Sequence, residues 1–283
     1  MNKDLKKYFP VFVLPTLVAF IIAFIAPFIM GFGLSFTKFN TVTNAKFVGL
    51  DNYVKIFTDP NHDFLKALGF TSLFTVVSII TVNVIAFALA MLLTRNIKGT
   101  NFFRGVFFLP NLIGGIVLGY IWQLLINGVL DMLVNSDITK SSTYGFWGLV
   151  ILNNWQLIGY MMVIYIAGIQ NIPGDLIEAA AIDGASPSKT LFKITIPMVM
   201  PSITICMFLT LTNSFKMFDQ NLALTGGAPG KETQMLAFDI YKTFYGRVGW
   251  QGVGQAKAVI FFIIVALIAL LQLRATRSKE VEQ

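Results

Sequence analysis

Two strongly apolar stretches of the chain carry uncharged polar side chains at helical spacing. The spacing is i, i+3, i+7 in one stretch and i, i+3, i+4 in the other, so each set shares one face of an α-helix. Amides and hydroxyls both donate and accept hydrogen bonds, as the hydroxyls of a sugar require. Trp155 and Phe215 lie beside these sets and offer rings on which a sugar face could stack. The candidate solute ligands are Asn153, Gln156 and Tyr160 in the first stretch and Thr210, Asn213 and Ser214 in the second.

The same residue types have a second role in membrane proteins, because amides and hydroxyls also join neighbouring helices by hydrogen bonds. Each of the six residues is therefore either a solute ligand or a contact between helices. Lys216 and Asp219 lie at the outer end of the second stretch. We interpret them as an interface pair or as vestibule residues rather than as ligands.

The residues that catalysis or metal binding would need do not converge in this sequence. Asp175, Glu178 and Asp183 lie near one another without a histidine, and the chain has one histidine, His62, and one cysteine, Cys206. We therefore expect no enzyme activity, no metal site and no disulfide, with His62 in a solvated loop and Cys206 as a packing residue. A Gly-x-x-x-x-Gly-Lys-Ser/Thr phosphate loop is also missing, so we expect no cofactor in this chain and no ATP bound by that means.

The composition is that of a membrane protein. Of 283 residues, 55% are hydrophobic and only 12% are charged, whereas about 25% charged residues is usual in a soluble domain. The net charge of +7 is scattered over many short segments. Lipid headgroups and membrane topology explain such scattered charge better than binding to nucleic acid.

Apolar runs predict an all-α polytopic membrane protein with six transmembrane helices. The N-terminal run is longer than the hydrophobic region of a signal peptide and has no small-residue cleavage site after it, so we expect it to be retained as the first span. Pro110 and the pair Gly114 and Gly115 interrupt the third span. The segments 38–66, 127–143 and 219–255 are expected to be polar loops. The predicted spans are about 9–36, 67–94, 103–126, 145–170, 198–218 and 256–273.

The distribution of basic residues predicts which side of the membrane each segment faces. Six spans place both termini on one side, and dense Lys and Arg near span ends mark the cytoplasmic side. We therefore expect a multi-pass protein of the plasma or inner membrane, with both termini and the segment 171–197 in the cytoplasm. The dense segments contain Lys3, Lys6 and Lys7; Arg95, Lys98 and Arg104; Lys189 and Lys193; and Arg274, Arg277 and Lys279.

Segment 171–197, between the fourth and fifth spans, has the signals of a short helix, a bend and a second helix. Good helix formers occupy Glu178–Ile182. Gly184 permits a sharp turn, because glycine adopts a positive φ without a Cβ clash. Ser186 can cap a second helix that begins with Pro187. Pro197 marks the entry to the next apolar run.

The motif in this segment resembles the EAA signature of binding-protein-dependent ABC importer permeases. Glu-Ala-Ala begins at Glu178, Gly184 follows after three further residues, and Ile-x-Ile-Pro ends at Pro197 after nine more. The family usually has Leu where Ile196 stands. The segments Phe47–Tyr53, Ile172–Pro173 and Thr225–Pro229 are also similar to the carbohydrate-uptake branch, which includes the maltose and multiple-sugar importer permeases.

This resemblance implies that segment 171–197 is a coupling helix that docks on a cytosolic ATPase. It also implies three kinds of partner: a second, different permease, two ATPase subunits that bind the ATP, and an extracytoplasmic solute-binding protein. The larger permease of the maltose transporter binds its sugar at similar positions on the fourth and fifth spans, although Met217 here replaces a polar residue. The residues predicted to couple to the ATPase are Glu178, Ala179, Ala180, Asp183, Gly184, Ile194 and Pro197.

The predicted function is half of the translocation pathway of an ATP-driven importer for a di- or oligosaccharide. Another polar solute, such as a glycerol phosphate, is an alternative cargo. A gradient-driven secondary transporter or channel is an alternative mechanism, but such proteins commonly place Asp, Glu or Lys near mid-membrane, where these spans have none. A membrane enzyme would need convergent acid–base groups in one pocket.

Overall fold

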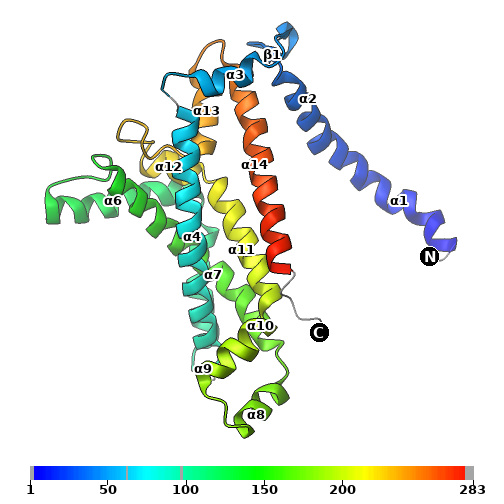
Figure 1. Ribbon diagram of the computed structural model, residues 1–283, viewed down its shortest axis with the longest axis vertical. Coiled ribbons are helices and arrows are strands. Elements are labelled where there is room, and N and C mark those ends of the chain that lie inside the picture. The colour runs from blue at the N-terminus through cyan, green and yellow to red at the C-terminus, as the bar shows by residue number, and fades with distance from the viewer. Residues whose placement is uncertain (1–2, 62, 96–97, 278–283) are drawn as a thin grey trace. The chain divides into compact units, whose positions relative to one another are not determined.

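The computed structural model describes residues 3–61, 63–95 and 98–277 (Figure 1). His62 and Lys279, which we expected in a loop and at a cytoplasmic end, lie outside these residues. Helices dominate the described part, and its two short strands pair as one antiparallel hairpin. The chain divides into two compact units, Met1–Phe64 with Ile240–Phe262 and Leu65–Asp239 with Ile263–Gln283.

Within the described residues, five helical stretches are long and apolar enough to cross a membrane. A sixth is counted when the bent pair Pro187–Met198 and Met200–Phe215, with 70° between the two helices, is taken as one span. The predicted class, an all-α polytopic membrane protein, is confirmed. The five stretches are Pro10–Leu34, Asp63–Leu93, Gly115–Val134, Ser142–Gln170 and Gln251–Thr276.

The first unit begins with a long apolar helical stretch, interrupted by a π-helical turn. None of the most apolar part of Pro10–Leu34 is buried in the protein, which suits side chains that face lipid. The elements of this unit are α1 (Lys3–Phe20), η1 (Ile21–Ile25), α2 (Ala26–Leu34), β1 (Thr37–Lys38), η2 (Val42–Asn44), β2 (Lys46–Phe47) and α3 (Asp51–Thr58), with most of α13 (Leu236–Gly246) and the first part of α14 (Gln251–Arg277).

The segment Phe47–Tyr53 serves a structural purpose in the first unit. Asn52 is buried, and its side-chain amide donates to the backbone oxygens of Ser35 and Thr37, each at 2.8 Å. The Tyr53 hydroxyl lies 2.7 Å from the Ser35 hydroxyl. These bonds satisfy the polar groups at the end of α2 and hold the strand hairpin against α3.

The second unit contains the remaining spans. Its elements are α4 (Asp63–Leu93, which begins in the first unit), α5 (Thr100–Phe108), η3 (Leu109–Leu112), α6 (Gly115–Val134), α7 (Ser142–Gln170), α8 (Gly174–Ile182), α9 (Pro187–Thr190), η4 (Leu191–Thr195), α10 (Ile196–Met198), α11 (Met200–Phe215), α12 (Asp219–Leu224) and the last part of α14.

The structure divides the predicted third span, 103–126, into two helices. A 3₁₀ turn replaces the α-helix at Leu109–Leu112, because Pro110 has no N–H to donate, and Gly114 is extended at φ −60° and ψ 138°. The second helix, α6, continues to Val134 and ends at Asn135 in the left-handed conformation. The polar segment that we expected from residue 127 is therefore helical in its first part.

The segment 219–255, which we expected to be a loop, contains α12 and α13. Its turn is organised by Asn221, which is fully buried. The Asn221 amide donates to the Thr225 hydroxyl at 2.9 Å and to the Thr233 carbonyl at 2.8 Å, and its oxygen accepts from the Met235 N–H. These bonds connect Thr225, at the start of the glycine-rich turn Thr225–Gly230, with Thr233 and Met235 beyond its end.

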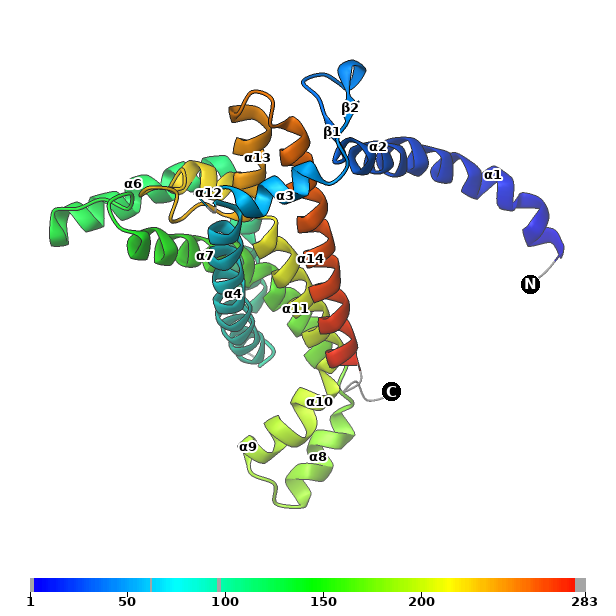
Figure 2. The ribbon, with the colours of Figure 1, turned by 45° about the horizontal axis from the view of Figure 1, so that its top comes forward.

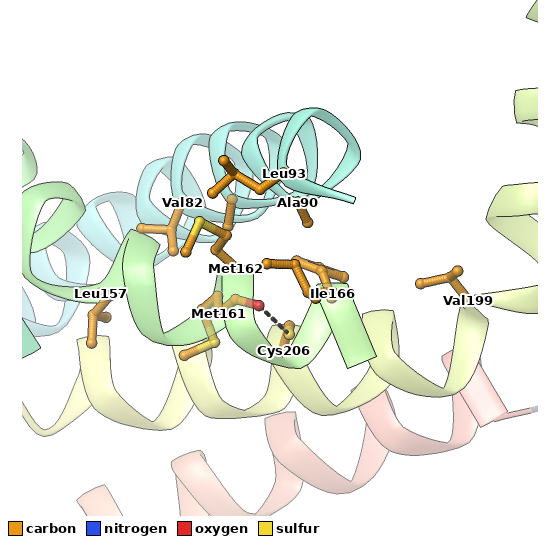
Figure 3. Packing of buried hydrophobic residues seen from close by; sticks show 11 residues of the cluster. Val82, Ala90, Leu93, Leu157, Met161, Met162, Ile166, Val199 and Cys206 are labelled. Atoms are coloured by element: carbon orange, nitrogen blue, oxygen red, sulfur yellow. Dashed lines mark hydrogen bonds between the residues drawn. The ribbon is translucent and has the colours of Figure 1, made fainter. Parts of the chain in front are cut away.

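The core of the second unit lies where α4, α7 and α11 meet. Val82 and Ala90 of α4 pack with Met162 of α7, and Cys206 of α11 contacts the Met161 carbonyl at 3.7 Å (Figure 3). Cys206 is fully buried among these apolar side chains, as predicted. This core fixes the faces of α7 and α11 that carry the candidate ligands.

Candidate functional site

A cavity of about 540 Å³ lies in the second unit between α7, α11, the 3₁₀ turn η3 and α12. Amides, a phenol and one ammonium group line it together with three apolar side chains. Its volume is within the range that small-molecule sites occupy in proteins. The lining residues are Asn111, Asn153, Gln156, Leu157, Tyr160, Leu209, Asn213, Lys216, Met217 and Gln220.

Four of the six residues proposed as solute ligands line this cavity, namely Asn153, Gln156, Tyr160 and Asn213. Asn153 is 2% exposed, and its amide nitrogen is buried without a hydrogen-bond partner among the described residues. An unpaired buried amide is unfavourable, and a bound hydroxyl could satisfy it. The stripe on α7 therefore meets the stripe on α11 at one cavity.

Thr210 and Ser214, the other two candidates, do not line the cavity. Thr210 is fully buried, donates to the Cys206 carbonyl at 2.8 Å and lies 3.3 Å from the Asn83 amide nitrogen. Asn83 in turn accepts from the Tyr165 hydroxyl at 2.7 Å. Thr210 thus belongs to a hydrogen-bonded contact among α4, α7 and α11. Ser214 is fully buried and is not among the residues that line the cavity.

The expected stacking rings also lie elsewhere. Phe215 is 2% exposed within the protein, and Trp155 is 43% exposed with its ring 5.7 Å from that of Trp122. Tyr160 is the single aromatic residue among those that line the cavity. Its ring packs edge-on against Phe108, with 6.3 Å between ring centroids.

Three polar lining residues were not among the predicted ligands, namely Asn111, Lys216 and Gln220. Gln220 donates to the Gln156 oxygen at 2.8 Å. Asn213, Lys216 and Gln220 are spaced i, i+3, i+7, so the polar stripe of α11 continues beyond the residue at which that helix ends. That spacing is the sequence signal that could have predicted Lys216 and Gln220. Asn111 lines the cavity because the third span is interrupted at η3, where this residue lies.

The segment between α7 and α11 has the predicted helix, bend and second helix, and it projects past these spans (Figure 2). Gly184 has φ +70°. Its N–H donates to the Ala181 carbonyl at 3.1 Å and the N–H of Ala185 donates to that of Ala180 at 2.9 Å, which is the hydrogen-bond pattern of a glycine-terminated helix. The Ser186 side chain accepts from the Lys189 N–H, as expected of a cap.

The residues predicted to couple to an ATPase differ in how exposed they are to solvent. Glu178, Ala179, Asp183 and Gly184 are exposed, whereas Ala180 is 8% exposed. The remaining two are half-buried, Ile194 in the π-helical turn η4 and Pro197 in α10.

The projecting segment joins α11 through a sharp bend. Val199, which is fully buried, separates α10 from α11 at φ −88° and ψ 2°, where the chain bends by 70°. A rigid α8–α9 hairpin attached through a bend to a cavity-lining helix could transmit a displacement to that helix.

The described residues offer no sign of metal or acid–base chemistry at either place. No group of three or more His, Cys, Asp or Glu side chains within the described ranges could hold a metal ion. A polar cavity framed by membrane helices, with an exposed helical hairpin attached to one of them, is the arrangement expected of a membrane transport protein.

The family follows from comparison with known proteins. Residues 83–278 match the binding-protein-dependent transport system inner membrane component family, and the chain belongs to this family. It is a multi-pass membrane permease of the ABC importer class, which confirms the resemblance predicted from residues 178–197.

Two relatives show how far the similarity extends. The chain is 45% identical to the probable starch degradation products transport system permease protein AmyD of Thermoanaerobacterium thermosulfurigenes, over 96% of this chain and 94% of the relative. It is 31% identical to the multiple sugar-binding transport system permease protein MsmF of Streptococcus mutans, over 99% of each chain.

Solved structures share the fold. A chain from a bacterial ABC transporter that imports the acidic polysaccharide alginate superposes with a TM-score of 0.81 at 19% identity, over 98% of each chain. A chain of the MetNI methionine ABC transporter gives a TM-score of 0.58 at 20% identity, over 79% of this chain and all of that one. The fold is therefore that of the membrane subunits of ABC importers.

Proposed function

We propose that this permease forms half of the pathway by which an ATP-driven importer takes up a di- or oligosaccharide. The observation that carries this proposal is the cavity, where the amides of Asn153, Gln156 and Asn213 and the phenol of Tyr160 converge. These groups match the donors and acceptors of sugar hydroxyls. The names of the two relatives, for starch degradation products and for multiple sugars, support the same class of cargo.

The α8–α9 hairpin is proposed as the docking site for a cytosolic ATPase, which would bind the ATP. Ile182 of α8 is 86% exposed, and Phe192 of η4, which directly follows α9, is 64% exposed. Exposed apolar side chains of this size favour a protein partner. Glu178 adds an exposed carboxylate, and a charge-assisted hydrogen bond to it could contribute about 1.5–3 kcal/mol.

A single chain supplies only part of a transmembrane pathway, so the proposal includes a second, different permease and two ATPase subunits. An extracytoplasmic solute-binding protein would deliver the cargo. One solved relative, the alginate transporter, is described in complex with a pentasaccharide-bound periplasmic protein. In this arrangement the α8–α9 hairpin and both termini face the cytoplasm, and no cofactor is held by this chain.

The proposed mechanism is a population shift between two states of the pathway. ATP would bind the closed pair of ATPases more tightly than the open pair, and the closed pair would hold the α8–α9 hairpins of the two permeases close together. Because the hairpin is attached to α11, its movement would open the cavity to the outside. ATP can drive this cycle only through its differential affinity for the two states.

The test is uptake of radiolabelled maltotriose into proteoliposomes that contain the complete importer and its binding protein. The proposal requires uptake that depends on ATP and persists after ion gradients are collapsed. Uptake that follows an ion gradient without ATP would instead indicate a secondary transporter. Glycerol 3-phosphate is the second probe, because relatives 28–29% identical to this chain are named as permeases for it and Lys216 lines the cavity.

A further inference from the structure

Lys216 gives the cavity a charge that its other lining residues do not balance. It is the C-terminal capping residue of α11, is exposed, and lines the cavity between Asn213 and Gln220. None of the ten lining residues is acidic. Asp219 is close in sequence but is not among them, and the ion pairs of the described residues do not include Lys216.

Lys216 places a cationic donor at the end of α11. The carbonyl groups at the C-terminus of α11 carry partial negative charge and stabilise a cation in the last turn. The Lys216 ammonium can donate three hydrogen bonds and accept none. The amides of Asn153, Gln156 and Gln220 donate and accept, so they place no charge requirement on a solute.

We infer that Lys216 is a charge-selectivity residue, which makes the cavity accept neutral and acidic saccharides and reject saccharides that carry an ammonium group. This inference rests on the proposed function and adds the class of cargo to it. A sugar hydroxyl accepts from the ammonium, and a carboxylate or phosphate of the cargo gains a charge-assisted bond. A protonated amino sugar at the same position meets an unbalanced like charge.

The expected size of the discrimination follows from Coulomb's law. Two like unit charges held several ångström apart at an effective dielectric constant of about 20 weaken binding by roughly tenfold or more. Because Lys216 is exposed, salt screens this interaction, and the discrimination should be largest at low ionic strength. Lys216 should therefore change the ratio of affinities for charged and neutral sugars rather than all affinities equally.

The experiment compares three probes of one length that differ in a single terminal group. Maltotriitol is neutral, maltotrionic acid carries a carboxylate, and 1-amino-1-deoxymaltotriitol carries an ammonium. Their binding to the assembled importer, purified without the binding protein, is measured by displacement of tritiated maltotriitol. The omission of the binding protein keeps its own specificity out of the measurement.

The variants are Lys216→Met and Lys216→Glu, with Lys140→Met as the matched loss of one exposed positive charge that does not line the cavity. The parent and Lys140→Met should bind the anion more tightly than the alditol and the cation about tenfold more weakly. In Lys216→Met the three affinities should converge to within about threefold, and in Lys216→Glu their order should reverse.

Two outcomes would overturn the inference, and they are distinguishable. If all three probes bind the parent, and the order of their affinities in both Lys216 variants is that of the parent, then Lys216 does not select charge although the cavity binds sugar. If no probe binds the parent at any concentration tested, the sugar cavity itself is refuted, and the charge selection is refuted with it.

Discussion

The amide nitrogen of Gln220 lies 2.8 Å from the amide oxygen of Gln156, so a hydrogen bond joins the start of α12 to the middle of α7 across one edge of the cavity. Gln156 also points its amide nitrogen at the Ile113 carbonyl, at 3.4 Å. The Gln156 side chain is thus held between the break in the third span, at Ile113, and α12, which follows α11. The hydroxyls of a solute that binds here would replace these hydrogen bonds of the Gln156 amide.

Gln156→Ala and Asn213→Ala should each weaken sugar binding by about threefold to tenfold, the effect of losing one net hydrogen bond. Equilibrium binding of maltotriitol to the assembled importer measures this. Asn154→Ala is the matched control, because Asn154 bonds to Thr81 and to the Val150 carbonyl and does not line the cavity. Equal losses in all three variants would argue that these amides only join helices.

Thr210→Val should lower stability without a change in sugar preference. Its buried hydroxyl donates to the Cys206 carbonyl within α11 and accepts from the Asn83 amide of α4, and the loss of this interhelical bond costs about 0.5–1.5 kcal/mol. Thermal unfolding of the purified protein in detergent measures the loss. A variant with unchanged stability and an altered order of sugar affinities would return Thr210 to the list of ligands.

Gly159→Ala should prevent correct packing of α7 against α5. A Cβ at Gly159 would collide with the carbonyl oxygen of Phe107, and backbone atoms cannot move aside as a flexible side chain does. The cost should exceed about 3 kcal/mol. Gly105→Ala, a helical glycine with open space around it, is the control. Yields of folded protein by size-exclusion chromatography should fall for Gly159→Ala alone.

Arg247 should stabilise the first unit in a pH-dependent way. It lies 3.2 Å from Asp59 and 2.7 Å from Asp63, with Trp250 stacked on its guanidinium at 4.8 Å. Burial of Asp59 would raise the pKa of its carboxyl, but the Asn61 N–H and the bond and charge of Arg247 outweigh burial and hold that pKa below its ordinary value of 3.8.

A carboxyl whose pKa is lowered by folding adds stability above the pKa of the unfolded chain, and this stability is lost as the pH falls through the lower, folded pKa. Arg247→Gln should therefore melt at a lower temperature than the parent at pH 7, and the difference should shrink below about pH 4. Thermal unfolding at both pH values gives the two differences. A gap that stays constant with pH would contradict the charge interaction.

The α8–α9 hairpin could be predicted from the sequence because its signals are local. Gly184 determines the turn through its own φ, and Ser186 with Pro187 begins the next helix within four residues. The cavity was only partly predictable. The stripe on α7 gave Asn153, Gln156 and Tyr160, but whether Thr210 meets solute or Asn83 is decided by α4, which is far away in the chain.

The missed residues depend on breaks in the helices. Pro110 and Gly114 are visible as interruptions, but which side chain they turn toward a cavity is set by packing against α7. Lys216 and Gln220 continue the stripe of Asn213 across the end of α11. A periodic pattern gives no indication that a side chain still faces the same cavity after the helix has stopped.

In the proposed mechanism, the α8–α9 hairpin transmits work from ATP hydrolysis to the cavity. Its most direct test is the number of maltotriose molecules imported per ATP hydrolysed, in proteoliposomes that contain the complete importer with Gly184→Val. Gly184 has φ +70°, which a β-branched residue adopts only with strain. Gly128→Ala, in α6 with open space around it, is the control. We predict that this ratio falls at least tenfold in Gly184→Val, with normal membrane insertion, and stays at the parent value in Gly128→Ala. A parental ratio in Gly184→Val, and also in Glu178→Ala, would contradict the account.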